Sequence, residues 1–330
     1  MSKKIVLGIA GVALIAGGVA YGMKAKYEDV LNKVLKEKNM TAEKVECSVS
    51  GNCVLTKVEK DNVLFDKIEI YNMSDIPNVK NLKDGSVGIK ITGIKSDGKY
   101  MSELIKDQIK NSKATDDAKE RMLKNLGDKV SFSFSSTIKT DDRKHVSYNS
   151  ELSLGNNKAT GSFESSLKKD ATDKDLETPE AIQKADFKIS KLDIGVNIPA
   201  ETVKAGIYLL YTNEIGAKEG YGYSSGRAAK MVNRKMLGEN TSTIYPYSAE
   251  LFKKVQANIK KQTGNSELEN KLIQKLADAS MKGFKINVKL TGKNGGVSLE
   301  ELGQIGYKIR AYGPQYAEKA IKSKVNIDIK

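Results

Sequence analysis

The chain has 330 residues, of which 39% are hydrophobic and 29% are charged, an ordinary composition for a folded body. Its formal net charge is +14, and residues 181–330 carry most of the excess, with 25 basic and 14 acidic groups. Because these charges are scattered, they indicate a lysine-rich solvated surface or contact with anionic lipid or an acidic partner. They do not favour nucleic-acid binding.

An uninterrupted apolar run over residues 5–23, with two lysines on either side, is the first feature of the chain. A helix of this length rises about 28 Å, close to the hydrocarbon thickness of a bilayer. Residues 1–26 are therefore predicted to form a transmembrane anchor. A signal peptide is the alternative, since Gly18-Val19-Ala20 offers a cleavage pattern, but the run is longer than the apolar core of a typical signal peptide.

Cys47 and Cys53 are the only cysteines, and Gly51-Asn52 between them is a turn signal that separates two alternating apolar runs. A hairpin would bring the thiols together, which predicts one disulfide in an oxidising compartment. Two unpaired cytosolic thiols are the alternative. Together with the anchor, the disulfide predicts a single-pass protein of the bacterial inner membrane, which residues 5–23 would cross, with its body in the periplasm.

Residues beyond the anchor show strand and helix patterns. Tyr27 to Lys38 has apolar residues at three-to-four spacing and is predicted to be a helix. Strands are expected over residues 44–49, 54–58, 63–71 and 86–95. Two amphipathic helices follow, one behind the candidate cap Ser102 and one that starts near Thr115. A meander of three strands then runs to Leu167.

Residues 168–180 are charged and lack apolar periodicity, which indicates a linker, and Thr178-Pro179 is expected to break any helix near its end. A strand from Phe187 to Ile198 changes its apolar parity, which predicts a bulge near Ser190-Lys191. The remaining pattern predicts helices after Pro199, over 228–237, after Ser248 and over 268–276, a strand over 284–290, a short helix from Gly313-Pro314 and a strand over 325–329.

These patterns predict an α+β fold in which antiparallel sheets are packed with amphipathic helices. The expected organisation is the anchor over 1–26, a first periplasmic unit over 27–168, a linker over 169–181 and a second periplasmic unit over 182–330. The order helix, helix, strand occurs both after Ser102 and after Ser248. This recurrence favours a duplicated unit, and chance recurrence of paired helices is the alternative.

The sequence offers little chemistry for an enzyme. His145 is the sole histidine, and no second metal-ligating residue type accompanies it in a recognised spacing. Asp116-Asp117 and Asp141-Asp142 lie at a helix start and at a turn, where capping and solvation explain them. Since the sequence also lacks a phosphate-binding loop and a calcium loop, no metal and no cofactor are predicted.

The most distinctive local segment is the glycine- and tyrosine-rich run from Gly220 to Arg227. Tyr221, Tyr223 and Arg227 are its candidate residues for contact with a ligand or partner, because backbone N–H groups and a guanidinium can hold an anion and tyrosines can stack on a sugar. A plain surface loop is the alternative. Nine of the fourteen tyrosines lie beyond residue 200, which fits either an interface or ordinary half-buried packing.

The layout resembles that of single-span bacterial envelope proteins with β-rich periplasmic bodies, including the AsmA-like group. The residues that carry this resemblance are Lys3-Lys4 with the apolar run, and the strand Leu64-Phe65-Asp66-Lys67-Ile68-Glu69-Ile70. The resemblance implies a β surface that serves envelope maintenance or lipid handling. The helix content and short length of this chain depart from the group and argue against an extended lipid groove.

The expected function is therefore that of a non-enzymatic envelope protein whose body binds or scaffolds a partner protein or an amphiphile. One alternative is a lipid-binding or lipid-transfer protein with an apolar β groove. Another is an enzyme that acts on an envelope glycan. The apolar periodicity of the strands fits a closed core and an open groove equally well.

Overall fold

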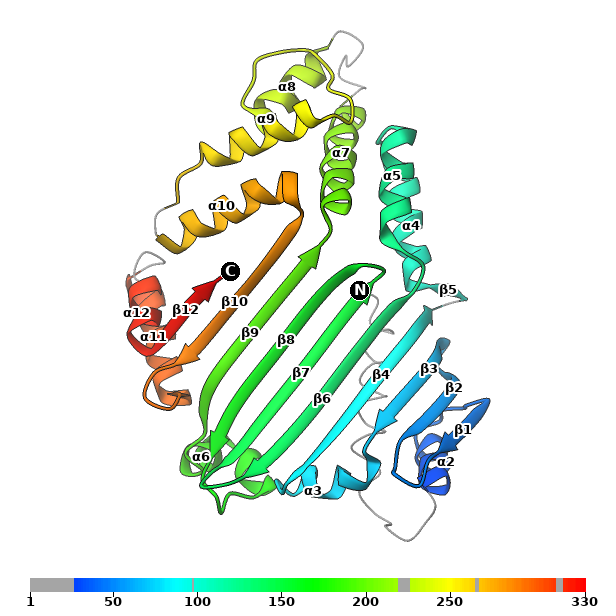
Figure 1. Cartoon of the computed structure of the whole chain (residues 1–330), viewed down its shortest axis with the longest axis vertical. Coiled ribbons are helices and arrows are strands. Elements are labelled where there is room, and N and C mark those ends of the chain that lie inside the picture. The colour runs from blue at the N-terminus through cyan, green and yellow to red at the C-terminus, as the bar shows by residue number, and fades with distance from the viewer. Residues whose placement is uncertain (1–26, 97, 219–225, 265–266, 313–316) are drawn as a thin grey trace.

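One antiparallel sheet of 12 strands forms the centre of the molecule (Figure 1). The computed structural model describes residues 27–330 except 97, 219–225, 265–266 and 313–316. Along the sheet the strands follow the order β1-β2-β3-β4-β6-β7-β8-β9-β10-β12, while β5 pairs with β4 and β11 pairs with β9. The architecture is α+β, as the periodicity of the sequence predicts.

The strand bounds agree closely with the alternating patterns of the sequence. The strands are β1 Lys44–Cys47, β2 Cys53–Lys60, β3 Val63–Tyr71, β4 Gly85–Ser96, β5 Lys99–Tyr100, β6 Val130–Thr140, β7 Lys144–Leu154, β8 Asn157–Leu167, β9 Lys188–Ile198, β10 Phe284–Gly292, β11 Val297–Ser298 and β12 Val325–Ile329.

The helices of the described residues lie between these strands. They are α2 Tyr27–Glu37, α3 Ile76–Lys80, α4 Met101–Lys110, α5 Asp116–Leu126, α6 Pro179–Lys184, α7 Ala200–Ala217, α8 Arg227–Leu237, α9 Ala249–Lys260, α10 Glu267–Lys282, α11 Leu299–Tyr312 and α12 Ala317–Lys324, with two 3-10 turns, η1 Met73–Asp75 and η2 Asp173–Leu176. The sequence patterns did not predict helices α3, α6 and α11 or the short strands β5 and β11.

The register gives the middle of the sheet two different faces, because successive side chains of a strand point to opposite sides. One row of cross-strand neighbours on β6 to β10 is apolar and defines the apolar face: Phe132, Leu152, Ala159, Val196 and Ile286. A row on the opposite side defines the polar face: Ser135, Asn149, Ser162, Asp193 and Lys289.

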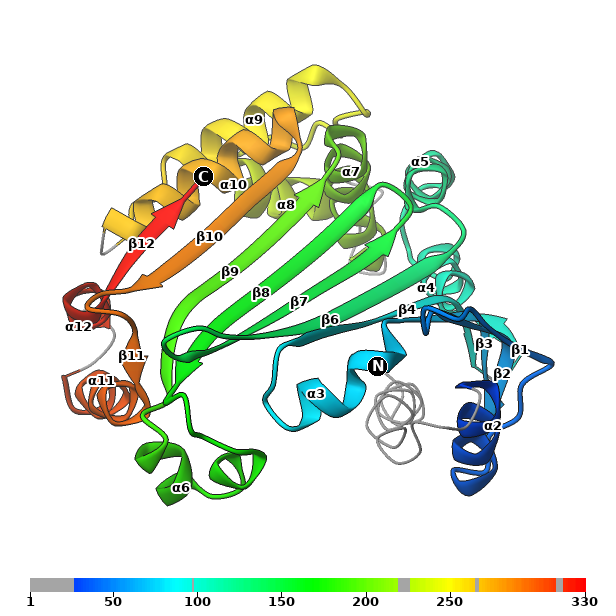
Figure 2. The same ribbon diagram turned by 60° about the horizontal axis from the view of Figure 1, so that its bottom comes forward.

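Short helices cover parts of the apolar face (Figure 2). On β1 to β4, α2 covers this face, since Leu31, Val34 and Leu35 are buried in one cluster with strand residues such as Phe65 and Ile68. At one end of β6 to β8, Leu82 after α3 and Ala185 after α6 pack with residues of the sheet, which are Ile138, Val146 and Leu167. The cover therefore lies at the side and at one end of the sheet.

Helices α4, α5 and α7 to α10 gather at the opposite end of the sheet, where two strand connections meet (Figure 1). One connection carries α4 and α5 between β4 and β6, and the other carries α7 to α10 between β9 and β10. Their cores merge, because Ala118 of α5 is buried in one cluster with Tyr211 of α7 and Phe252 of α9. The Lys113 N–H also donates to Asn213 Oδ1 at 2.7 Å.

Several local predictions are confirmed. Thr115 and Ser248 cap α5 and α9 by accepting from backbone N–H groups. The register between β8 and β9 shifts opposite Ser190, as the change of parity predicts. The order helix, helix, strand is present as α4-α5-β6 and as α9-α10-β10.

Two local predictions are wrong. Ser102 does not cap α4, because it lies inside the helix and its hydroxyl donates to the Asp128 carbonyl. Thr178-Pro179 begins a helix instead of breaking one, because the Thr178 hydroxyl caps α6 and proline suits the first helical turn.

Two further predictions concern the membrane anchor and the linker. In the described part of the chain, none of the helices is long and apolar enough to cross a membrane. The anchor predicted over 1–26 lies outside the described residues. The predicted linker over 169–181 holds η2 and the first turn of α6, and β8 pairs with β9 on either side of it.

Candidate ligand-binding face

The centre of the apolar face is exposed to solvent. Phe134 of β6 is 38% exposed, Leu152 of β7 44% and Ile194 of β9 47%. On the same strands Ile138 and Val146 are nearly fully buried, because the segments around α3 and α6 pack on that end. The apolar face is therefore exposed at its centre and buried where helices pack against it.

Four aromatic rings form a line across this face. Ring centroids are separated by 5.8 Å from Phe134 to Tyr148, 6.1 Å from Tyr148 to Phe163 and 6.4 Å from Phe163 to Phe187. The register places these rings on neighbouring strands, since Tyr148 lies opposite Phe163 and next to Phe134 diagonally. Burial raises the pKa of Tyr148, so its hydroxyl stays neutral.

The aromatic line ends at a cavity of about 600 Å³ between α6, β11 and α11. Phe187 stacks on Phe163 and also lines this cavity. The wall is otherwise mostly polar, with lysines and carboxylates from three segments. The cavity therefore places charged groups at one end of an apolar and aromatic strip.

Ion pairs fix the wall of this cavity. Arg143 Nη1 lies 2.9 Å from Asp186 Oδ2, and Lys188 Nζ lies 3.6 Å from Asp186 Oδ1. Burial raises the pKa of Asp186, but Arg143 and Lys188 outweigh it and hold that pKa below its usual value. Lys324 lies 2.7 Å from Glu301, and hydrogen bonds from Lys324 and Ser298 lower the pKa of Glu301.

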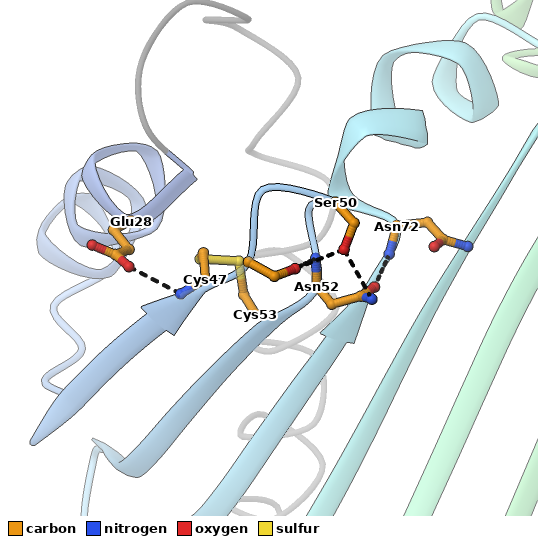
Figure 3. The surroundings of a disulfide bond; sticks show 7 residues. Glu28, Cys47, Ser50, Asn52, Cys53 and Asn72 are labelled. Atoms are coloured by element: carbon orange, nitrogen blue, oxygen red, sulfur yellow. Dashed lines mark hydrogen bonds between the residues drawn. A yellow bond between two sulfur atoms is a disulfide. The ribbon is translucent and has the colours of Figure 1, made fainter.

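The predicted disulfide between Cys47 and Cys53 is present (Figure 3). The two cysteines lie opposite each other at the end of the β1–β2 hairpin. The Cys47 N–H donates to Glu28 Oε1 at 3.0 Å, which ties α2 to the hairpin, and the Asn72 N–H donates to Asn52 Oδ1 at 3.0 Å. The disulfide stabilises the edge of the sheet and lies away from the uncovered strands (Figure 1).

Of the three predicted loop residues, the structure describes Arg227 alone. Tyr221 and Tyr223 lie outside the described residues. Arg227 is exposed and begins α8, which follows Gly226 in a left-handed conformation. Since α8 belongs to the helical end of the molecule, Arg227 is remote from the aromatic line (Figure 1).

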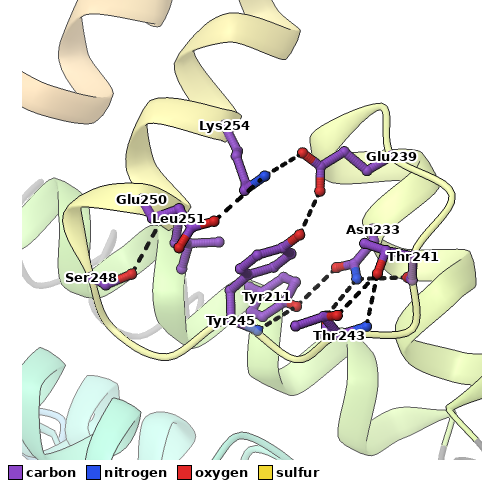
Figure 4. Close-up of polar contacts among 10 residues, drawn as sticks. All are labelled: Tyr211, Asn233, Glu239, Thr241, Thr243, Tyr245, Ser248, Glu250, Leu251 and Lys254. Carbon is purple, nitrogen blue, oxygen red and sulfur yellow. Dashed lines mark hydrogen bonds and ion pairs between the residues drawn. The ribbon is translucent and has the colours of Figure 1, made fainter.

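Several of the C-terminal tyrosines have a structural role (Figure 4). The hydroxyl of Tyr211 donates to Asn233 Oδ1 at 2.8 Å and accepts from the Tyr245 N–H at 3.2 Å. The Tyr245 hydroxyl donates to Glu239 Oε2 at 2.7 Å, and Lys254 lies 2.6 Å from the other carboxylate oxygen. Tyr307, by contrast, is 71% exposed.

His145 is exposed on β7, with Nε2 3.5 Å from Asp142 Oδ1, and this contact lowers the pKa of Asp142. Across the residues that the structure describes, no group of three or more His, Cys, Asp or Glu side chains could hold a metal ion.

No family model matches this chain, and a search of curated proteins found no match either. The case for a function therefore depends on the geometry of the molecule. The sequence showed that each central strand alternates, but only the register aligns the apolar positions of neighbouring strands in common rows. The three consecutive strand patterns rich in Phe and Tyr, from Phe132 to Phe163, were the signal for the aromatic line.

Proposed function

We propose that this chain is a membrane-anchored envelope protein whose body binds an amphiphile on the apolar face of β6 to β10. The observation that carries this proposal is the exposed centre of that face, with Phe134, Leu152 and Ile194 between 38% and 47% exposed. Several large apolar side chains exposed on one face of a protein favour a binding site there.

An acyl chain is the occupant that suits this surface best. Each methylene that leaves water for an apolar contact contributes about 0.8 kcal/mol, so micromolar binding needs about ten fully buried methylenes before the entropic cost of association is counted. The rings of the aromatic line give a narrow apolar track. The row from Phe132 to Ile286 on the same face is apolar throughout, while Ser150 lies in the row of Phe134 and Ile194. The polar cavity at one end of the track provides for the polar part of an amphiphile.

The proposed location follows from the N-terminal sequence and the disulfide. Residues 5–23 would anchor the protein in a bacterial inner membrane, and the body would lie in the oxidising periplasm, where the disulfide is stable. This arrangement would hold the apolar face near a source of lipid. It agrees with the lipid handling that the resemblance to AsmA-like proteins implies.

Duplication of one unit also remains a proposal. Both helical connections leave and re-enter the sheet at the same end, which supports it (Figure 1). The longer connection differs by having α7 and α8 before its helix pair. The proposed division into units over 27–168 and 182–330 places one helix pair in each.

Photo-crosslinking in membranes tests whether an amphiphile binds to the apolar face. The full chain is expressed in bacteria that are fed a fatty acid with a photoactivatable group, and labelled peptides are identified by mass spectrometry. We expect labels on β6 to β9. Ile194→Lys should remove most of this labelling, because an ammonium in the track is costly to desolvate.

Asn197→Lys is the matched control. It lies on the same strand, is exposed and points to the polar face. Labelling of the sheet should survive this change. Labels confined to residues 5–23, or lost equally in both variants, would contradict binding on the apolar face.

A further inference from the structure

We propose that the cavity at the end of the aromatic line recognises a zwitterionic head group that contains a phosphate and an ammonium. This inference rests on the proposed function and deepens it, because it names the class of amphiphile. It follows from the position of the cavity and from the charges in its wall.

The position of the cavity ties it to the apolar track. Phe187 belongs to both, because its ring stacks on Phe163 and also lines the cavity. Ile182 of α6 and Leu299 of α11 add apolar surface at the same cavity. An amphiphile with its acyl chain along the rings would therefore bring its polar end into this space.

Lysines and carboxylates are equal in number among the side chains that line the cavity. Three lysines and three carboxylates line it: Lys188, Lys293, Lys324, Asp186, Glu300 and Glu301. A head group with a net negative charge would gain no net attraction from such a wall, while it would still lose hydration on entering. A head group with both charges matches a wall that has both.

Two of these six residues are available to a ligand. Lys188 pairs with Asp186, and Lys324 pairs with Glu301. Lys293 and Glu300, in contrast, are exposed and form no ion pair with any residue that the structure describes. Within the described ranges, Lys293 Nζ donates to the Lys322 carbonyl at 2.6 Å, and Glu300 accepts from the Gln304 side chain at 3.4 Å.

These two side chains supply complementary partners for a zwitterion. The ammonium of Lys293 can donate to a phosphate oxygen, and the carboxylate of Glu300 can accept from an ammonium, both as charge-assisted hydrogen bonds. Lys293 lies before β11 and Glu300 lies in the first turn of α11, so the two groups come from opposite ends of one short segment.

Competition against the photoactivatable fatty acid tests this inference. The full chain is prepared in a detergent with an uncharged sugar head group. Three competitors with the same acyl chain are compared, bearing phosphoethanolamine, phosphoglycerol or glycerol alone. We expect phosphoethanolamine to displace the label from β6 to β9 at a concentration about tenfold lower than phosphoglycerol.

Variants of Lys293 and Glu300 show whether these two side chains cause the head-group preference. Glu300→Lys gives the cavity a formal excess of two positive charges, so phosphoglycerol should become the better competitor. Lys293→Gln should weaken both phosphate-bearing competitors and leave glycerol unchanged. Glu180→Lys makes the same charge change on α6 outside the cavity wall, and its order of competitors should be that of the unaltered chain.

The outcomes separate the two proposals. If all three competitors act equally on the unaltered chain and on Glu300→Lys, the apolar face binds acyl chains and the head-group inference is wrong. If the sheet of the unaltered chain is not labelled at all, the amphiphile proposal fails and this inference fails with it. Circular dichroism of each variant shows whether it is folded.

Discussion

At the scale of single residues, Asn233 holds the helical end together. It is fully buried, and its amide nitrogen donates to the carbonyls of Thr241 and Thr243 at 2.9 and 2.7 Å, while its oxygen accepts from Tyr211. One side chain thus fixes the loop between α8 and α9 against α7. Only an amide offers donors and an acceptor at these positions.

Asn233→Asp should therefore destabilise the protein strongly. The change keeps the shape but places a carboxylate oxygen against two carbonyls, and we expect the free energy of unfolding to fall by about 3 kcal/mol. Urea unfolding followed by circular dichroism measures it. Asn240→Asp is the control, since Asn240 is exposed in the same loop. An equal effect of both changes would argue against the buried network.

Glu239, in the same loop, makes the stability of the protein depend on pH. Hydrogen bonds from Lys254 and Tyr245 hold the pKa of Glu239 below its ordinary value of 4.5. A carboxyl group whose pKa is lowered by folding stabilises the protein above its unfolded pKa, and this contribution is lost as pH falls through the folded pKa.

Glu239→Gln should therefore lower the free energy of unfolding at pH 7, by about 1 kcal/mol because the group is partly solvated. Below pH 4.5 the difference between the variant and the unaltered chain should shrink progressively. Urea titrations at pH 7, 5, 4 and 3 measure it. A difference that is independent of pH would show that packing and not charge is responsible.

At the scale of elements, the end of α5 meets the turn between β7 and β8 through two glycines. Gly127 follows α5 with φ +74°, and Gly155 occupies the turn with φ +59°. A Cβ on Gly127 would lie 2.7 Å from the Gly155 Cα, so the two backbones touch. This contact sets the position of the helix relative to the sheet.

Gly127→Ala should lower the free energy of unfolding by about 3 kcal/mol, from backbone strain together with overpacking against backbone. Gly98→Ala is the control for the contact. Its φ of +80° also lies in the range that favours glycine, but a Cβ there meets nothing within 4 Å. Thermal or urea unfolding should show a cost for Gly98→Ala that is about 2 kcal/mol smaller. Equal losses of stability in the two variants would mean that the Gly127–Gly155 contact accommodates a methyl group without cost.

The disulfide hairpin is the second element with a measurable contribution. Cys47 and Cys53 are separated by six positions, and Cys53 is buried beneath α2. Closing so short a loop restricts the unfolded chain by about 2 kcal/mol. Reduction should lower the stability of the oxidised protein by that amount. A chain with both cysteines replaced by alanine should not respond to the reductant, and an unaltered chain that does not respond either would contradict the prediction.

At the scale of the whole molecule, the sequence predicts the strands and the fold class but not which surface is left open. Alternation along β6, β7 and β8 is visible residue by residue, because each strand has its own period of two. Whether Ile194 or Ile138 is covered depends on where α3 and α6 pack, and these helices are too short to show a period. Helix α11 was missed because Gly303 and Gly306 weaken its helical signal.

The disulfide is the one predicted site feature that the structure contains. Its two cysteines are six positions apart, so the local turn signal between them was sufficient to predict the disulfide. The aromatic line and the cavity join residues from Phe134 to Gln304, and no local pattern encodes pairing over such a range. The prediction of a ligand-binding loop over Gly220 to Arg227 was based on its glycine and tyrosine content alone.

The order of the strands has a consequence for how the protein is made. Each strand on the path of the sheet pairs with the strand that precedes it on that path, from β1 to β12. If the chain is exported as proposed, the strands next to the anchor emerge first. Later strands can then add to one growing edge of the sheet, and no completed part must reopen to admit them. Growth pauses three times, at β4, at β9 and at β10, until α4–α5, α7–α10 and α11–α12 have passed. In a chain exported in this way, those strands are where an export chaperone would find unpaired backbone for longest.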